Sequence, residues 1–397
     1  MISFGQTAFN DPATLSTDAP NFVDATYTHN FDKSRNVQWR TYYNSYRFLA
    51  TFRYPLEDGS LDSKQRLVGD WIGSQLSYRF LLPRFGSLTL GATGQLDVRS
   101  LMQNIDVAPV YQELPRIDKR DKSAAVFAQD EWNFAPRWTL SGGMRFDYSQ
   151  YRDNFVSPRA ALIYQSSSRS SYKLLYGKAF RNPTEFELFY TDSKTQTIGN
   201  PDARPETANT VEFVVEHKMG ARFNGLVSAY RYGIDGLIVG DYTADGLFQY
   251  RNADAVRASG LEIELNGQPT PWLDLVTSLA VQRAVKTAHD SPLPNSPGAI
   301  GKFRVSLPLF HSGLWVANSL QYMGARQTLA GAALPPVLLS DIILSSNRLT
   351  SNLDFQLGVR NVGNARYDHP LALNSRVDTL IAPGRSFFVS FTWQTRK

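Results

Sequence analysis

The titratable side chains of this sequence do not fall into the spacings that catalysis or metal binding uses. The chain has no cysteine, which excludes disulfides, thiolate metal sites and cysteine nucleophiles. No nucleophile, base and orienting residue are suitably spaced, and no phosphate-binding glycine loop occurs. Its five histidines are scattered along the chain, as His29, His217, His289, His311 and His369. The sequence therefore predicts a protein that is not an enzyme and that carries no cofactor and no metal.

The two carboxylates that come nearest to a catalytic pair are Glu262 and Glu264. They alternate with apolar residues in the segment SGLEIELNG. Residues two apart in a strand point to the same face of the sheet, so both carboxylates share one polar face. We interpret them as wall residues that hydrogen-bond neighbouring polar groups and not as a general acid and base.

The same alternation of apolar and polar residues recurs along the chain. It is clear in SLTLGATGQLDVR at 87–99, in WTLSGGMRFDYS at 138–149 and in LDFQLGVRN at 353–361. A soluble sandwich with one wet face would show this period as well. Sandwich strands usually have five or six residues, however, and many of these segments have ten or more, which suits a tilted strand that crosses a membrane.

The connections between the expected strands alternate between short and long. Short connections fall at 32–36, 83–86, 134–138, 166–171, 218–222, 268–272, 310–313 and 347–352. Long connections fall at about 56–66, 104–121, 150–155, 181–208, 240–247, 287–298, 326–336 and 364–384. Periplasmic turns and extracellular loops of an outer-membrane barrel produce this parity. The sequence thus predicts an all-β fold, a transmembrane antiparallel up-and-down β-barrel with about 16–18 strands in this chain.

Composition agrees with a membrane barrel. Aromatic residues make up 13% and charged residues 19% of the chain, and no apolar run of the length of a membrane helix occurs. The net charge is +5, but arginine and lysine are spread over strands and turns and form no basic patch. We therefore expect no nucleic-acid partner. Aromatic residues cluster near the expected strand ends, where interfacial girdles lie, as at Phe134, Trp138, Trp272, Trp315 and Tyr322.

Five sequence motifs point to one family. The first joins Phe180-Arg181-x-Pro183 to Gly199-Asn200-Pro201 and Arg204-Pro205-Glu206, with Ala203 in place of the usual leucine. The others are VFAQDEW at 126–132, RNADAVRASGLEIELNG at 251–267, NVGNARYDHP at 361–370 and PGRSFFVSFTW at 383–393. In this order they resemble the barrel of TonB-dependent receptors, over roughly residues 120–394.

The resemblance implies a barrel of roughly 22 strands that is preceded by a signal peptide, an energy-coupling box and a plug domain. None of these three features is visible in the sequence. About seventeen strands are expected, and because bacterial single-chain barrels have an even number, this odd count suggests that the chain begins partway round the barrel. We therefore expect residues 1–19 to be the remnant of an extracellular loop and residues 20–397 to be a partial receptor-like barrel domain. We also expect about five further strands, a plug and a signal sequence to be encoded upstream.

The resemblance also implies a function, a location and partners. Such receptors lie in the Gram-negative outer membrane as multi-pass barrels and import a scarce, large substrate with energy from TonB, which acts through the plug region. A ferric siderophore is the expected substrate, and cobalamin, haem and oligosaccharides stay open. Further expected partners are outer-membrane lipid, lipopolysaccharide and the barrel-assembly machinery, around a monomer. The alternatives are a passive porin-like channel and a non-functional truncated fragment.

Polar and aromatic residues of the longest expected loops are the candidates for ligand contact. Arginine suits an anionic siderophore, and aromatic rings suit a catecholate or a sugar face. The candidates are Arg181, Glu185, Phe189, Tyr190, Asp192, Tyr242, Arg326, Tyr367 and His369.

Overall fold

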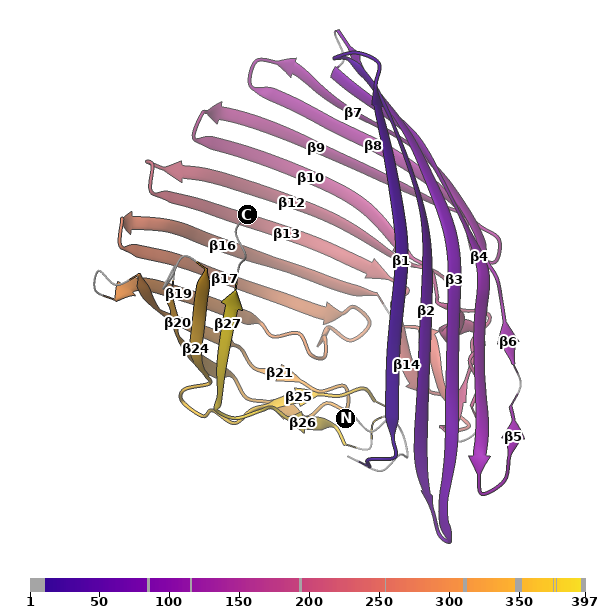
Figure 1. Cartoon of the computed structure of the whole chain (residues 1–397). Coiled ribbons are helices and arrows are strands. Elements are labelled where there is room, and N and C mark those ends of the chain that lie inside the picture. The colour runs from indigo at the N-terminus through magenta and orange to yellow at the C-terminus, as the bar shows by residue number, and fades with distance from the viewer. Residues whose placement is uncertain are drawn as a thin grey trace.

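A single large antiparallel sheet dominates the computed structural model (Figure 1). The structure describes residues 11–393 except 84–85, 115, 193–194, 254, 310–312, 347–351, 374 and 376. Of the 20 strands in the sheet, seventeen have eight residues or more, and each of these pairs with the next one along the chain. An all-β, up-and-down antiparallel fold with 16–18 long strands is thereby confirmed.

The seventeen long strands carry the sheet in chain order. They are β1 (Leu15–Asn30), β2 (Arg35–Leu56), β3 (Gly59–Leu82), β4 (Gly86–Ala108), β7 (Lys122–Ala135), β8 (Trp138–Ser149), β9 (Phe155–Ser167), β10 (Ser170–Arg181), β12 (Glu206–Met219), β13 (Phe223–Asp235), β16 (Val256–Thr270), β17 (Leu273–Lys286), β19 (Ala299–Leu309), β20 (Leu314–Met323), β23 (Val337–Ser346), β24 (Leu353–Arg360) and β27 (Ser386–Trp393).

Short elements lie in the long connections. Three two-residue strands of the main sheet pair with β4 or β17: β5 (Gln112–Glu113) and β6 (Ile117–Asp118) with β4, and β18 (Ser291–Pro292) with β17. The others form small sheets of their own: β11 (Thr197–Ile198) with β14 (Ile238–Tyr242) and β15 (Phe248–Asn252), β21 (Arg326–Gln327) with β22 (Ala333–Leu334), and β25 (Asp368–Pro370) with β26 (Thr379–Ile381). The helix α1 (Glu185–Phe189) has five residues. In the described residues no helix has the length and apolarity needed to cross a bilayer.

The two faces of the sheet differ as the alternation predicts. On β16, Leu261 and Ile263 are 38% and 41% exposed on the outer face, and Glu262 points to the opposite, concave face. On β4, Leu96 and Val98 are likewise exposed on the outer face. A soluble protein would bury such side chains, so an outer face this rich in exposed apolar residues is suited to contact with lipid.

Aromatic rings line the outer face near the short turns. Phe134 contacts Trp138 at 6.2 Å between ring centroids, Trp138 stacks on Tyr164 at 4.5 Å, and Tyr164 stacks on Tyr172 at 6.2 Å. The row crosses β7, β8, β9 and β10 just where these strands meet their short turns. It has the position and composition of an interfacial girdle.

The strands β1 and β27 form the two edges of the sheet. Within the described residues, β1 pairs only with β2 and β27 only with β24, and in Figure 1 they face each other across the open side. Strand β1 begins at Leu15, inside the segment 1–19 that was expected to be a loop, and residues 1–10 lie outside the described part.

Two of the long loops expected from the sequence are shorter in the structure. Strands β2 and β3 meet at a turn of two residues, Glu57 and Asp58, so the expected loop at 56–66 is mostly strand. Strand β4 likewise continues to Ala108, into the expected loop at 104–121. The turns expected at 310–313 and 347–352 lie mostly outside the described residues.

Candidate functional site

The long connections gather at one end of the sheet, the lower end in Figure 1. Five of the nine predicted ligand-contact residues, those from Arg181 to Asp192, lie in or directly beside the connection that contains α1. The helix begins because Thr184 caps it: its hydroxyl accepts the N–H of Glu187, and the Glu187 carboxylate accepts the N–H of Thr184. Glu185 and Glu187 also lie in the first turn, where negative charge interacts favourably with the positive end of the helix dipole.

Arg181, at the end of β10, connects α1 to the start of β12. Its guanidinium donates to both oxygens of Glu206, each at 2.9 Å, and to both oxygens of Glu187, at 2.9 and 3.2 Å. These hydrogen bonds to Glu206 and Glu187 raise the pKa of Arg181. Arg181 was predicted to contact ligand. In the structure its donors are engaged by two carboxylates, which tie the loop of α1 to the ends of β10 and β12.

Arg152 holds Glu185 in a second ion-pair network. It is 12% exposed at its side chain and donates to Glu185 Oε1 at 2.5 Å, to Asp121 and to the carbonyl of Pro183 at 2.9 Å. Asp121 also accepts the hydroxyl of Ser149 at 2.8 Å. Arg152 is not among the residues predicted from the sequence, because nothing in the loop 150–155 separates a buried arginine from an exposed one.

Tyr190 anchors the segment that follows α1. Its phenol oxygen accepts hydrogen bonds from Gln65 Nε2 and Asn104 Nδ2, both at 2.9 Å, and donates to Asp192 Oδ2 at 3.2 Å. Tyr190 is 8% and Asp192 4% exposed. Burial is the largest cause that raises the pKa of Tyr190, and the nearby Asp192 charge adds to it. Both residues were predicted to contact ligand, and both lie in the packed interior of the loop assembly.

A row of aromatic rings links Tyr190 to Tyr242. Phe186 stacks on Tyr190 with centroids 4.3 Å apart and contacts Tyr250 at 6.1 Å. Phe248 contacts Tyr250 at 5.4 Å and Tyr242 at 5.6 Å. Tyr242, at the outer end of the row, is 45% exposed. Phe189 lies apart from the row, and the Lys119 ammonium is 5.4 Å from the centre of its ring.

The family motifs supply the backbone geometry of this assembly. A Cβ on Gly199 would lie 2.6 Å from the carbonyl oxygen of Leu188, so no larger residue fits there. The Asn200 side chain donates to the carbonyl of Tyr250 at 2.9 Å. Asn252 accepts the N–H of Arg204 at 2.8 Å and donates to its carbonyl at 2.8 Å. These residues hold the loops of this assembly together.

The remaining candidates, Arg326, Tyr367 and His369, lie in a second cluster of loops. Arg326 is 7% exposed and donates to the carbonyl of Asp368 at 2.6 Å. The neighbouring Thr328 is fully buried, and its hydroxyl donates to Asp378 at 2.6 Å. The Tyr367 and His369 rings meet edge to face at 5.1 Å, and His369 is exposed.

The concave face carries a polar cavity of about 440 Å³ beneath α1. Several carboxylates line this cavity, and its lining also includes two basic residues, Arg99 and Arg152. The acidic lining residues are Asp97, Asp121, Asp147, Asp153 and Glu185. No group of three or more possible metal ligands is found in the described residues. The lining offers hydrogen-bond donors and acceptors to a polar group.

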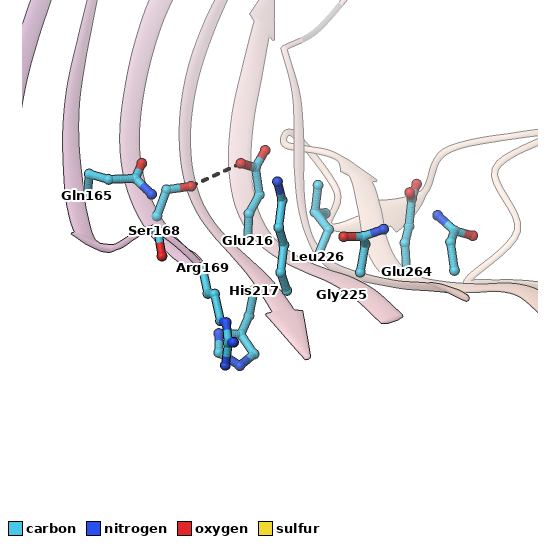
Figure 2. A pocket seen from close by; sticks show the side chains of 12 residues that line it. Gln165, Ser168, Arg169, Glu216, His217, Gly225, Leu226 and Glu264 are labelled. Atoms are coloured by element: carbon cyan, nitrogen blue, oxygen red, sulfur yellow. Dashed lines mark hydrogen bonds between the residues drawn. The ribbon is translucent and has the colours of Figure 1, made fainter. Parts of the chain in front are cut away.

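A second polar cavity, of about 420 Å³, lies at the opposite end of the sheet, near the short turns (Figure 2). Glu216 and Glu264 point into it from β12 and β16, and Arg169 and His217 point away below the strand ends. Glu216 accepts hydrogen bonds from Ser171 at 2.9 Å and from Lys173 at 2.6 Å. The Glu216 carboxylate is thus engaged by side chains of the neighbouring strand β10, as expected of a wall residue.

Many of the predicted ligand residues form hydrogen bonds or ion pairs that stabilise the loops at the end of the sheet. Five of the nine predicted ligand residues are tied into the loops: Arg181, Glu185, Tyr190, Asp192 and Arg326. Tyr242 and His369 are exposed, and Phe189 and Tyr367 are partly so. The structure brings six of the nine into one assembly around α1 and leaves three in the second cluster.

Several characterised proteins are similar to parts of the chain. It is 27% identical over 178 residues to heme/hemopexin utilization protein C of Haemophilus influenzae, which covers 36% of this chain and 25% of that protein. It is 27% identical over 135 residues to the vitamin B12 transporter BtuB of Vibrio cholerae, 34% of this chain and 19% of that one. It is 20% identical over 293 residues to the probable TonB-dependent siderophore receptor PiuA of Acinetobacter baumannii, 64% and 38% respectively.

Solved structures show the same fold. The copper transporter OprC superposes with a TM-score of 0.79 at 16% identity, over 94% of this chain and 65% of that one. The ferric yersiniabactin receptor FyuA of Yersinia pestis superposes with a TM-score of 0.76 at 13% identity, over 98% and 63%. This chain thus spans less than two thirds of either structure.

A family model extends the match to nearly the whole chain. The model described as TonB dependent receptor-like, beta-barrel, matches residues 3–362. That range contains the α1 assembly, and the match ends just after β24. The chain belongs to the family of TonB-dependent receptor-like β-barrels.

Proposed function

We propose that this chain is the barrel portion of an outer-membrane receptor that imports a ferric siderophore with energy from TonB. The family and the fold support a place in the Gram-negative outer membrane, and two of the relatives are named a vitamin B12 transporter and a probable siderophore receptor. One observation supports the siderophore in particular. Of these relatives, the one that matches the longest part of this chain, 64%, is named a siderophore receptor.

The two ends of the sheet give the proposal its geometry. Loops tied together by buried hydrogen bonds form a rigid rim at the long-connection end, which suits the capture of a large ligand. We assign ligand contact to the exposed or partly exposed candidates, Phe189, Tyr242, Tyr367 and His369. The candidates that are engaged in hydrogen bonds, such as Arg181 and Tyr190, are positioning residues that hold the rim in shape.

Binding of a panel of ferric siderophores to cells that carry the complete gene tests this proposal. We expect one member of the panel to bind, and the double substitution Tyr242→Ala with His369→Ala to weaken that binding. Arg169→Ala, at the opposite end of the sheet, is the control and should leave binding unchanged. Equal binding of all ferric siderophores by cells with and without the gene would refute the proposal.

The alternative of a passive porin-like channel makes a different prediction. An open lumen would give a steady, large conductance in a planar bilayer, whereas a gated receptor would not. The conductance of the natural full-length product therefore separates the two functions.

A further inference from the structure

Three arginines meet on the outer face of neighbouring strands. In the register of β13, β16 and β17, Arg231 lies opposite Ser259, and Ser259 lies opposite Arg283. Arg257 lies two residues from Ser259 and therefore points to the same face. That face is the outer one, because it also carries the exposed Leu261.

The arginines lie directly at the border of the apolar band. The next row toward the short turns contains Leu261 and Val281, which are 38% and 39% exposed, and the row after it contains Ile263 and Leu279, at 41% and 46%. Rows on one face are about 6.8 Å apart along a strand. On the other side, β13, β16 and β17 lead into long connections. The cluster thus occupies the level where hydrocarbon gives way to lipid headgroups, at the long-connection end.

The three side chains line a common cavity of about 370 Å³. Arg283 is partly neutralised, since it donates to Asp290 Oδ2 at 2.6 Å. Arg231 and Arg257 are exposed, and the described residues provide neither of them with an ion pair. Gly233 of β13 lies opposite Arg257, and Asp235 follows two residues later. This carboxylate does not line the cavity. The other lining residues are Ala258, Ser259, Val285, Thr287 and Asp290, so the lining carries a net positive charge.

We propose that Arg231, Arg257 and Arg283 bind the phosphate groups of a phosphorylated glycolipid in the outer leaflet. Guanidinium groups match phosphate oxygens in pairs of parallel hydrogen bonds and are less strongly hydrated than ammonium groups. The exposed Leu261 and Val281 lie where the acyl chains of such a lipid would pack. The site faces away from the concave side, so it is independent of the imported substrate and goes beyond the transport function.

Lipid binding by the purified full chain in detergent tests the site. Three probes are titrated: bisphosphorylated lipid A, the same lipid without phosphates, and inorganic pyrophosphate. We expect the phosphorylated lipid to bind tightly and the other two weakly. The triple variant Arg231→Gln, Arg257→Gln, Arg283→Gln should bind the phosphorylated lipid roughly a hundredfold less well, at about fivefold for each arginine lost.

A matched variant controls for loss of charge. Arg137→Gln, Arg169→Gln, Lys218→Gln removes three exposed cations near the short turns and should leave lipid binding unchanged. Far-UV circular dichroism of each variant shows whether the sheet is intact, and single arginine variants replace the triple variant should it fail to fold. Equal binding by the arginine variants and the parent would overturn the site, and pyrophosphate binding as tight as that of the lipid would overturn its assignment to a lipid.

Discussion

Asn104 Nδ2 donates a hydrogen bond of 2.9 Å to the phenol oxygen of Tyr190, a residue 86 positions later in the chain. The bond joins the far end of β4 to the segment after α1, and Gln65 on β3 donates to the same oxygen. Both donors lie where β3 and β4 extend into segments expected to be loops, so the elongated β3–β4 pair supports the loop rim. The Tyr190 hydroxyl is thus one of the buried supports of the rim.

Replacing Tyr190 by phenylalanine tests this support. The ring can still stack on Phe186, but Asn104 and Gln65 lose their acceptor, and an unsatisfied buried donor costs about 1–3 kcal/mol. We expect a lower unfolding temperature in detergent and faster proteolysis of the segment 182–200. Tyr242→Phe removes an exposed hydroxyl in the same aromatic row and should change neither. Equal behaviour of the two variants would show that the Tyr190 hydroxyl supports nothing.

Gly199 offers a steric test of the same assembly. Alanine would bring its Cβ to 2.6 Å from the carbonyl oxygen of Leu188 and to 2.8 Å from the carbonyl carbon of Phe189. Such overpacking against backbone costs about 1–3 kcal/mol. At Gly177 nothing lies within 4 Å of an added Cβ, so Gly177→Ala is the matched control. Chemical unfolding monitored by tryptophan fluorescence should separate the two variants, and a neutral Gly199→Ala would mean that the loop is not packed on α1.

The ion pairs of Arg152 and Arg251 differ in burial and should differ in energy. Arg152 is 12% and Asp121 8% exposed, whereas Arg251 and Asp241 are 46% and 44% exposed. Arg152→Gln leaves a buried carboxylate without its cation and should destabilise the protein by about 2–4 kcal/mol. Arg251→Gln should cost about 0–1 kcal/mol, as is usual for surface pairs. Unfolding free energies of the two variants that agree within error would contradict the burial of Arg152.

The pH dependence of stability should report on Glu187. Burial raises the pKa of Glu187, but hydrogen bonds from Arg181 and Thr184 outweigh it, so that its pKa lies below the ordinary 4.5. A carboxyl whose folded pKa is lowered stabilises the protein above its unfolded pKa, and that stabilisation is lost as the pH falls through the folded value. When the pH is lowered below about 4.5, we expect the unfolding temperature to decrease. In the Arg181→Gln variant this decrease in unfolding temperature should be smaller. An identical pH profile for both proteins would contradict the role of Arg181.

Much of the fold is predictable from the sequence, because the outer face of a membrane sheet must be apolar along every strand. Leu261 and Glu262 fall on opposite faces of β16 as their alternation predicts. The expected and observed numbers of long strands agree for the same reason. Loop ends were less predictable: β2 and β3 continue past the membrane as a hairpin, where alternation no longer has to be strict. The turn at Glu57 and Asp58 was thus mistaken for part of a longer loop.

The burial of the loop residues could not be predicted from the sequence. Tyr190 and Asp192 have the composition of a ligand site, but whether a loop aromatic is buried depends on what packs over it. Here the partners are Gln65 and Asn104, far away in sequence. Arg152 was missed for the same reason, since its burial comes from Asp121 and Glu185 on other segments. The type of a loop residue predicts the chemistry that it can do, and only the fold assigns that chemistry to a ligand or to a neighbour.

Energy-dependent uptake tests the central claim most directly. Uptake of radiolabelled iron, supplied as the ferric siderophore that binds best, is measured in cells with the complete gene, in cells without it, and in cells that lack TonB. We predict uptake only when both the gene and TonB are present. Uptake that continues at the same rate without TonB would contradict an energised receptor, and the same uptake without the gene would contradict its role in iron transport.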